Sequence, residues 1–305
     1  MSKKRLIGGV AIPAVLAVLV LWGCSLRKEA AVGTPGNPLV VVFSPEHVPQ
    51  GSGGELLLIA RYLSGKTGLT VEAKTAATAI DAVDLLGNGV ADMGFLTTEE
   101  YLVAREEHGV KAVLQVLRRG KETQYDGVIL AQTAGGPRDS AELAGVKFAF
   151  GDPYSISGYF LPSVFLKKAG VKVEPVFAGS HDAAVKELVE GRAAAAATYA
   201  APASSRPGLR VLAVTGTAPN EPVVARKSLL PEKREAVAAA LLELPGTPEG
   251  RRALGAVADI TGFRPVSEEA YRSTHELLRA AGKSVYDLLP GGWHIRVLSE
   301  PYMPL

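Results

Sequence analysis

From residue 38 onward, short runs of β-branched apolar residues alternate with longer segments in which apolar residues recur every three or four positions. The short runs are typical of buried strands, and the longer segments are typical of amphipathic helices. In the first part of the chain this pattern predicts strands at residues 39–43, 69–73, 91–96, 111–118 and 125–132, with helices near 52–65, 79–86 and 97–107. In the second part it predicts strands at 146–150, 171–177, 193–198, 209–214 and 223–226, helices near 157–169 and 182–190, and a mainly helical end.

This alternation predicts the α/β class with mostly parallel sheets. A stretch of Thr, Gly, Pro and charged residues at 133–139 separates the two series. We therefore predict two lobes joined by a two-segment hinge, the first made of residues 39–132 plus 220–305 and the second of residues 133–219. A ligand cleft is expected between the lobes, because open α/β sheets bind ligands at the carboxyl ends of their strands.

The N-terminus has the pattern of a signal peptide. Three basic residues precede an uncharged run at 6–22, which closes on Gly23 and Cys24. We assign residues 1–23 to the signal peptide. A retained transmembrane anchor is the alternative, although the run is slightly shorter than the roughly 20 residues that span a bilayer. LWGC at 21–24 resembles the bacterial lipobox, which implies lipidation at Cys24, a mobile linker at 24–38 and a place at the membrane on its extracytoplasmic side.

Composition and spacing give little support to other classes of function. The net charge is +2, and no basic patch suggests a nucleic-acid partner. The chain has one cysteine, so no internal disulfide is possible, and its five histidines are not spaced as metal ligands. GxSxG, P-loop and GxGxxG motifs are absent from the sequence. We therefore predict no metal and no cofactor, and an extracytoplasmic enzyme remains only a rival interpretation.

The most informative segment is GDPYSISGYFLP at 151–162, which follows a predicted buried strand and enters a predicted helix. The first N–H groups of a helix have no intrahelical partner and attract anions. Ser155 and Ser157 add hydroxyl donors, and Gly158 lets the backbone approach a ligand closely. The segment predicts an oxyanion site. Taken alone, the same residues are also compatible with an ordinary helix cap and a turn glycine.

GDPYSISGY at 151–159 resembles the GDPxSTSG(F/Y) signature of phosphonate-binding proteins of ABC importers. ADMGFL at 91–96 is similar to the family's VDIAF strand, AGSHD at 178–182 to its aGsHe turn, and NEPVVARK at 220–227 to its GDPIVxRK segment. The resemblance implies a type II periplasmic-binding fold. It also implies a monomer that closes on a phosphonate, phosphite or phosphate ion and docks on the transmembrane subunits of an ABC permease.

The resemblance assigns roles residue by residue. Ser155 and Ser157 match phosphonate-contacting serines, but Ile156 replaces the usual threonine between them, so only its backbone N–H remains as a donor. His181 matches a ligand-facing histidine, which a bound oxyanion would hold protonated. Tyr125 matches a tyrosine that reaches the ligand as the lobes close, and Glu221 matches an acidic residue that faces a ligand amine. Each has a structural alternative: an exposed first-turn histidine, a core tyrosine, a solvated glutamate.

Other positions widen or weaken the assignment. Ser44, Thr97 and Thr98 follow predicted first-lobe strands and are further candidate donors, although Thr97 also fits as a helix cap. Ala79 stands where the resemblance leads us to expect a tyrosine, and Ala201 stands where a second acidic residue could complete a site for a ligand amine. Both differences disfavour an aminoalkyl ligand. A carrier or sensor of another anion, such as sulfonate or nitrate, is therefore the alternative within the same fold.

Overall fold

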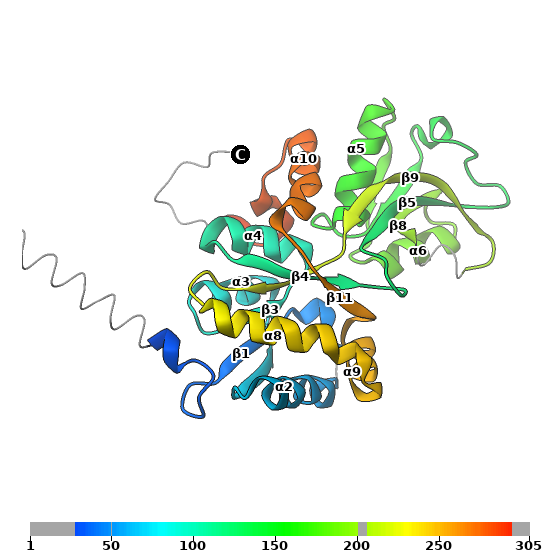
Figure 1. Ribbon diagram of the computed structural model, residues 1–305. Helices are drawn as coiled ribbons and strands as arrows, with labels where there is room; N and C mark the ends of the chain where they lie inside the picture. The colour runs from blue at the N-terminus through cyan, green and yellow to red at the C-terminus, as the bar shows by residue number, and fades with distance from the viewer. Residues whose placement is uncertain (1–27, 50, 201–205, 295–305) are drawn as a thin grey trace, which may run out of the picture.

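A computed structural model describes residues 28–49, 51–200 and 206–294 and shows two α/β lobes (Figure 1). The first lobe contains a six-stranded sheet with the order β11-β4-β10-β3-β1-β2. Its strands are β1 (Leu39–Phe43), β2 (Val71–Thr75), β3 (Met93–Phe95), β4 (Lys111–Leu117), β10 (Pro222–Ala225) and β11 (Gly262–Pro265). Its helices are α2 (Gly53–Thr67), α3 (Ala79–Gly87), α4 (Thr98–His108), α8 (Pro231–Glu243) and α9 (Pro248–Ala258).

The second lobe contains a five-stranded sheet with the order β7-β6-β8-β5-β9. Its strands are β5 (Gln124–Gln132), β6 (Lys147–Phe150), β7 (Glu174–Phe177), β8 (Ala195–Tyr199) and β9 (Leu209–Pro219). Its helices are the π-helix η3 (Ile156–Phe160), which runs into α5 (Leu161–Lys168), and α6 (His181–Val189). In both sheets the strands of the βαβ units pair in parallel. The strands β5 and β10, each of which is the first strand after the chain passes from one lobe to the other, pair antiparallel with their neighbours.

The predicted lobe boundary at residues 132/133 differs from the structure by one strand. β5 pairs with β8 and β9 of the second sheet, so the chain crosses between the lobes after β4 and not after β5. The return crossing lies between β9 and β10, close to the predicted position at residue 220. The apolar run at 125–132 identified a buried strand, but hydrophobicity alone does not indicate which sheet a strand joins.

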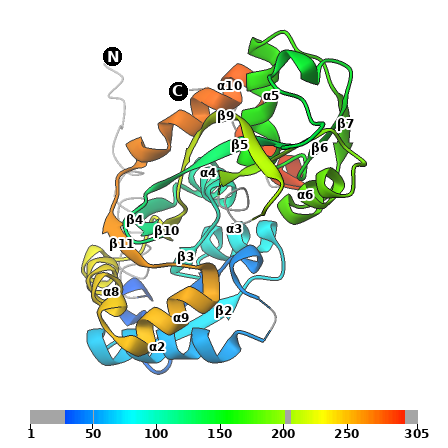
Figure 2. The same cartoon turned by 90° about the vertical axis from the view of Figure 1, so that its right-hand side faces the viewer.

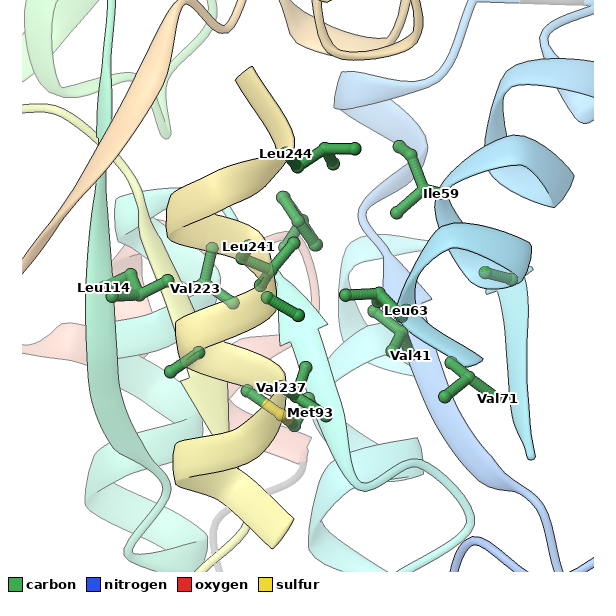
Figure 3. Close-up of a cluster of buried hydrophobic side chains, with 14 of the residues drawn as sticks. Val41, Ile59, Leu63, Val71, Met93, Leu114, Val223, Val237, Leu241 and Leu244 are labelled. Carbon is green, nitrogen blue, oxygen red and sulfur yellow. The ribbon is translucent and has the colours of Figure 1, made fainter. Parts of the chain in front are cut away.

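The core of the first lobe fills the space between one face of its sheet and the helices α2 and α8 (Figure 3). Each strand presents apolar side chains to this layer, and each helix presents a stripe spaced by three or four residues. Burying such a side chain contributes about 1.5–3 kcal/mol. The labelled members are Val41, Ile59, Leu63, Val71, Met93, Leu114, Val223, Val237, Leu241 and Leu244.

A second core cluster joins the two lobes. It contains Leu96 and Tyr101 of the first lobe and Phe160 and Leu161 of the second. The helix α10 (Arg272–Ala281) contributes Leu278 to this cluster and packs against η3 and α5, and Figure 2 shows α10 next to α5. Helix α10 therefore bridges the lobes, and does not simply extend the first one.

The residues just before β1 are docked on the first lobe, which differs from the predicted mobile linker at 24–38. Glu29 pairs with Arg226 at 2.6 Å, the Lys233 ammonium donates to the carbonyl oxygens of Glu29 and Ala30, and Val32 is buried in the core. A mobile linker therefore does not extend over residues 29–38. The signal peptide and Cys24 lie outside the described residues. No helix within the described ranges is both long and apolar enough to cross a bilayer.

Candidate functional site

The predicted anion segment forms a tight turn at the carboxyl end of β6. The Gly151 N–H donates to the Gly158 carbonyl at 3.1 Å, and the Ser155 hydroxyl accepts from the Gly158 N–H at 2.9 Å. Residues 156–160 form the π-helix η3, at the start of which the Phe160 N–H donates to the Ser155 carbonyl at 3.1 Å. The sequence predicted an α-helix from residue 157. The wider π turn keeps Ser155 at its N-cap and delays α5 to Leu161.

The turn is held in place by Leu161, the first residue of α5. A Cβ on Gly127 of β5 would lie 2.9 Å from the Leu161 side chain, and one on Gly216 of β9 would lie 2.8 Å from it. These two glycines therefore leave a bare patch on the β5–β9 pair, into which Leu161 packs. That contact fixes the start of α5, and with it the preceding turn, over the carboxyl end of the sheet.

His181 lies beside the turn at the first position of α6. Its Nε2 is 3.3 Å from the Ser155 hydroxyl, and its buried Nδ1 has no hydrogen-bond partner among the described residues. Burial lowers the pKa of His181, although Asp152 and Asp182 oppose that shift. The ligand-free protein therefore holds a neutral imidazole here, and the protonated form expected from the sequence would require the bound anion.

Tyr125 contacts the turn from within the second lobe. It is the second residue of β5, and its hydroxyl lies near the side chain of Ser157, which is only 2% exposed. Tyr125 was expected to approach as the lobes close, but its strand belongs to the same sheet as the turn. Tyr199, the last residue of β8, lies edge-on to both rings; its ring centroid is 5.1 Å from that of His181 and 6.3 Å from that of Tyr125.

The contact from the opposite lobe comes from Glu99, which sequence reasoning missed. Glu99 is the second residue of α4, and its Oε1 accepts from the Ile156 N–H at 3.2 Å. Burial, with smaller effects from Glu221 and Asp152, raises the pKa of Glu99 to about 7. A protein carboxylate thus occupies the backbone donor that we had predicted for a ligand oxyanion.

Glu221 is engaged at the hinge. The Arg118 guanidinium donates to its Oε2 at 2.9 Å, and His47 Nε2 lies 3.9 Å from its Oε1. Burial alone would raise the pKa of Glu221, but Arg118 and His47 together hold it below its usual value. The role predicted for Glu221, facing a ligand amine, would require it to leave or share this ion pair.

Ser44 and Thr97 take part in hydrogen bonds within the first lobe, whereas Thr98 bonds to the last residue of β9. Thr97 and Glu100 form a reciprocal capping box at the start of α4, and Ser44, which is fully buried, donates to Glu100 at 2.8 Å. The buried Thr98 hydroxyl donates to the Pro219 carbonyl at 3.4 Å. These hydroxyl groups are therefore engaged in hydrogen bonds within the protein.

The surface beside Tyr125 is hollowed. An open hollow of about 410 Å³ lies next to the hinge and is lined by Arg119, Glu122, Gln124, Tyr125, Asp126 and Ala200. Its lining is mostly polar and charged. Among the described residues, no group of three or more His, Cys, Asp or Glu side chains is arranged to hold a metal ion.

Comparison with known proteins places these features in a family. The sequence model of the ABC-transporter periplasmic substrate-binding proteins for phosphonate matches residues 55–271. Among similar solved structures, a Xanthomonas citri protein bound to ATP is 19% identical at a TM-score of 0.65, with 80% of this chain and 96% of that chain covered.

Two further structures have the same fold. A binding-protein component of a phosphonate ABC transporter from Pseudomonas aeruginosa is 16% identical at a TM-score of 0.62, and the match covers 80% of this chain and 87% of that chain. PhnD1 from Prochlorococcus marinus, in complex with methylphosphonate, is 18% identical at a TM-score of 0.64, over 81% of this chain and the whole of that chain. The predicted two-lobed α/β class is confirmed.

Proposed function

Because the chain belongs to the periplasmic substrate-binding protein family of phosphonate ABC transporters, we propose that it captures a small phosphorus oxyanion between its lobes. The family consists of solute-binding proteins and not of enzymes. The proposed ligand is a phosphonate, phosphite or phosphate ion. One copy of the chain closes on this ion and presents it to the transmembrane subunits of an ABC permease.

The observation that carries this proposal is the convergence of donors around the turn after β6. Ser155, Ser157, His181 and Tyr125 come from three elements of the second lobe and lie around this turn. Together with the Ile156 amide they offer hydroxyl, imidazole and backbone donors to one small volume. A tetrahedral oxyanion has several acceptor oxygens, so it can use such a set at once.

Calorimetric titration with methylphosphonate, phosphate and phosphite tests the proposal. Replacing both Ser155 and Ser157 by Ala should weaken binding at least tenfold, because two hydrogen bonds to a charged group are lost. Ser273→Ala, at an exposed position of α10, serves as the matched control and should leave affinity unchanged. Unchanged affinity in the double variant would place the ligand elsewhere.

The organic end of the ligand is the less constrained part of the proposal. Ile156 removes one hydroxyl that the family signature supplies, and Glu221 is engaged by Arg118. We therefore propose a ligand without an amine, such as methylphosphonate, in preference to aminoethylphosphonate. The same titrations with sulfate, nitrate and a sulfonate test the second candidate, which is a carrier or sensor of another anion. Strong binding of only these ions would reject the phosphorus ligand class.

We further propose that the mature protein is held at the extracytoplasmic membrane surface by lipid on Cys24. The support is the sequence LWGC at 21–24 after a basic and then apolar leader. Acyl chains contribute about 0.8 kcal/mol for each buried methylene, so several chains on one cysteine anchor a protein stably. Cys24→Ser should move the protein from the membrane fraction to the soluble fraction, whereas a retained transmembrane anchor would keep it in the membrane.

A further inference from the structure

The Glu99 carboxylate lies where one oxygen of the proposed ligand would lie. Its Oε1 accepts from the Ile156 N–H at 3.2 Å, and this donor belongs to the first turn of η3. We call the Ile156 N–H together with the Ser155 and Ser157 hydroxyls the anion seat. Glu99 comes from α4 of the first lobe, whereas the seat belongs to the second lobe, so the hydrogen bond crosses the interlobe cleft.

The charged groups around Glu99 make it an unfavourable neighbour for an anion. Glu221 faces it from the return crossing, Asp152 from the turn after β6, and Glu100 from the next position of α4. Tyr125, facing it from β5, is neutral because burial, Glu99 and Glu221 hold its pKa well above its usual value. An oxyanion entering the seat would therefore meet an acidic group that already holds one of the donors it needs.

We propose that Glu99 is a resident carboxylate that holds the anion seat in the ligand-free protein, and that an oxyanion binds by replacing it there while Glu99 takes up a proton. This inference rests on the function proposed above. The proton comes from solvent and forms an O–H bond on the Glu99 carboxyl, while the Ile156 N–H exchanges its hydrogen bond from Glu99 to the ligand. The neutral carboxyl then no longer repels the bound ion and can donate to one of its oxygens.

The protonation state of Glu99 fits this exchange. Burial raises the pKa of Glu99 to about 7, so near-neutral solution supplies both of its forms. Below that pH Glu99 is neutral and competes weakly for the Ile156 N–H, and above it the carboxylate competes strongly. Oxyanion affinity should therefore rise as pH falls. Part of this pH dependence comes from protonation of Glu99 and not from protonation of the ligand.

Glu99→Gln removes the charge and the proton site while keeping the shape of the side chain. Affinity for methylphosphonate should rise about tenfold at about pH 8 and should change little at about pH 6. The titration of the ligand itself is common to both proteins, so the ratio of their affinities isolates Glu99. Calorimetry in two buffers of different ionisation enthalpy should show extra proton uptake at about pH 8 in the native protein only. Glu106→Gln, an exposed position on the same helix, is the charge-matched control and should behave like the native protein.

A measurement without ligand separates this inference from the proposed function. In the free native protein the Ile156 amide resonance should titrate with a midpoint near pH 7, and this titration should be absent in Glu99→Gln. If no oxyanion binds either protein but the amide titrates, the proposed function fails while the Glu99 contact stands. If oxyanions bind but Glu99→Gln equals the native protein at both pH values, the inference is overturned and the proposed function stands. Weaker binding in Glu99→Gln would also overturn it, since Glu99 would then be a partner of the ligand.

Discussion

Gly158 lies under the two side chains that the proposed site uses most directly. A Cβ at this position would lie 2.9 Å from the Ser155 hydroxyl oxygen and 3.1 Å from His181 Cε1. Separations this short require the neighbours to shift, and both neighbours are proposed donors to the ligand. The absence of a side chain at residue 158 therefore serves the geometry of the site as well as the turn.

Gly158→Ala should weaken methylphosphonate binding about tenfold while costing about 1–3 kcal/mol of stability, because one inserted methyl group displaces Ser155 and His181 together. Calorimetry and urea unfolding measure the two effects. Gly54→Ala on α2 is a suitable control, since no atom lies within 4 Å of its added Cβ. Full affinity in Gly158→Ala would mean that Ser155 and His181 need not hold their present positions.

The residues of the proposed site differ in how well their role could be predicted from the sequence. Ser155 and His181 belong to motifs that could be recognised in the chain, and the structure brings them within 3.3 Å of each other. Glu99 gave no such signal, because an acidic residue in the first turn of a helix is ordinary. Its significance comes from a contact with Ile156, 57 positions away in the chain, and no local pattern records which side chain crosses the cleft.

At the scale of elements, strand positions followed from apolar runs and helix starts from caps. Residues 39–43 were predicted as a strand and form β1 with the same bounds, and Thr97 caps the start of α4, the second of the two roles that its sequence position allowed. β11 was missed because Gly262–Pro265 has no apolar run and pairs at the sheet edge. The π-helix η3 was missed because its sequence is compatible with an α-helix, and the Ser155 cap decides between them.

The α4 capping box allows the two interpretations of Thr97 to be separated. Thr97→Ala should lower the free energy of unfolding by about 0.5–2 kcal/mol, because the Glu100 N–H loses its acceptor. Methylphosphonate affinity should stay within about twofold, since the hydroxyl serves the helix. Thr97→Ser keeps the hydroxyl and should restore stability in urea unfolding. Lost affinity without lost stability would instead make Thr97 a ligand donor.

At the scale of the whole molecule, the two crossing segments are tied together where the lobes meet. The buried Asn220 amide donates to the Val116 and Glu122 carbonyls at 3.1 and 2.8 Å, and buried Gln115 donates to the Thr123 and Asn220 carbonyls at 3.0 and 3.2 Å. Side-chain amides thus satisfy backbone groups of both crossings. The two crossing segments should therefore move together as one unit, which we call the strap. This behaviour suits lobes that close about a hinge.

Glu221 adds a charge to this strap, and its ion pair with Arg118 gives the hinge a pH dependence. Since the pKa of Glu221 is lower in the folded protein than the usual 4.5, the pair contributes stability above that pH and loses it as pH falls through the folded value. Glu221→Gln should lower the free energy of unfolding by about 1–2 kcal/mol at neutral pH, with the difference vanishing in acid. The exposed pair of Glu122 with Arg119 provides the control, because Glu122→Gln should change stability by less than about 0.5 kcal/mol.

The same Glu221→Gln variant tests whether the hinge glutamate also binds ligand. If Glu221 serves the strap alone, calorimetry should show equal, small changes in affinity for methylphosphonate and aminoethylphosphonate, because both enter a site whose donors are unaltered. If it faces a ligand amine, only aminoethylphosphonate should bind more weakly, by about tenfold for one lost hydrogen bond to a charged group. A selective loss would contradict the amine-free ligand proposed here and would mean that ligand binding draws Glu221 away from Arg118.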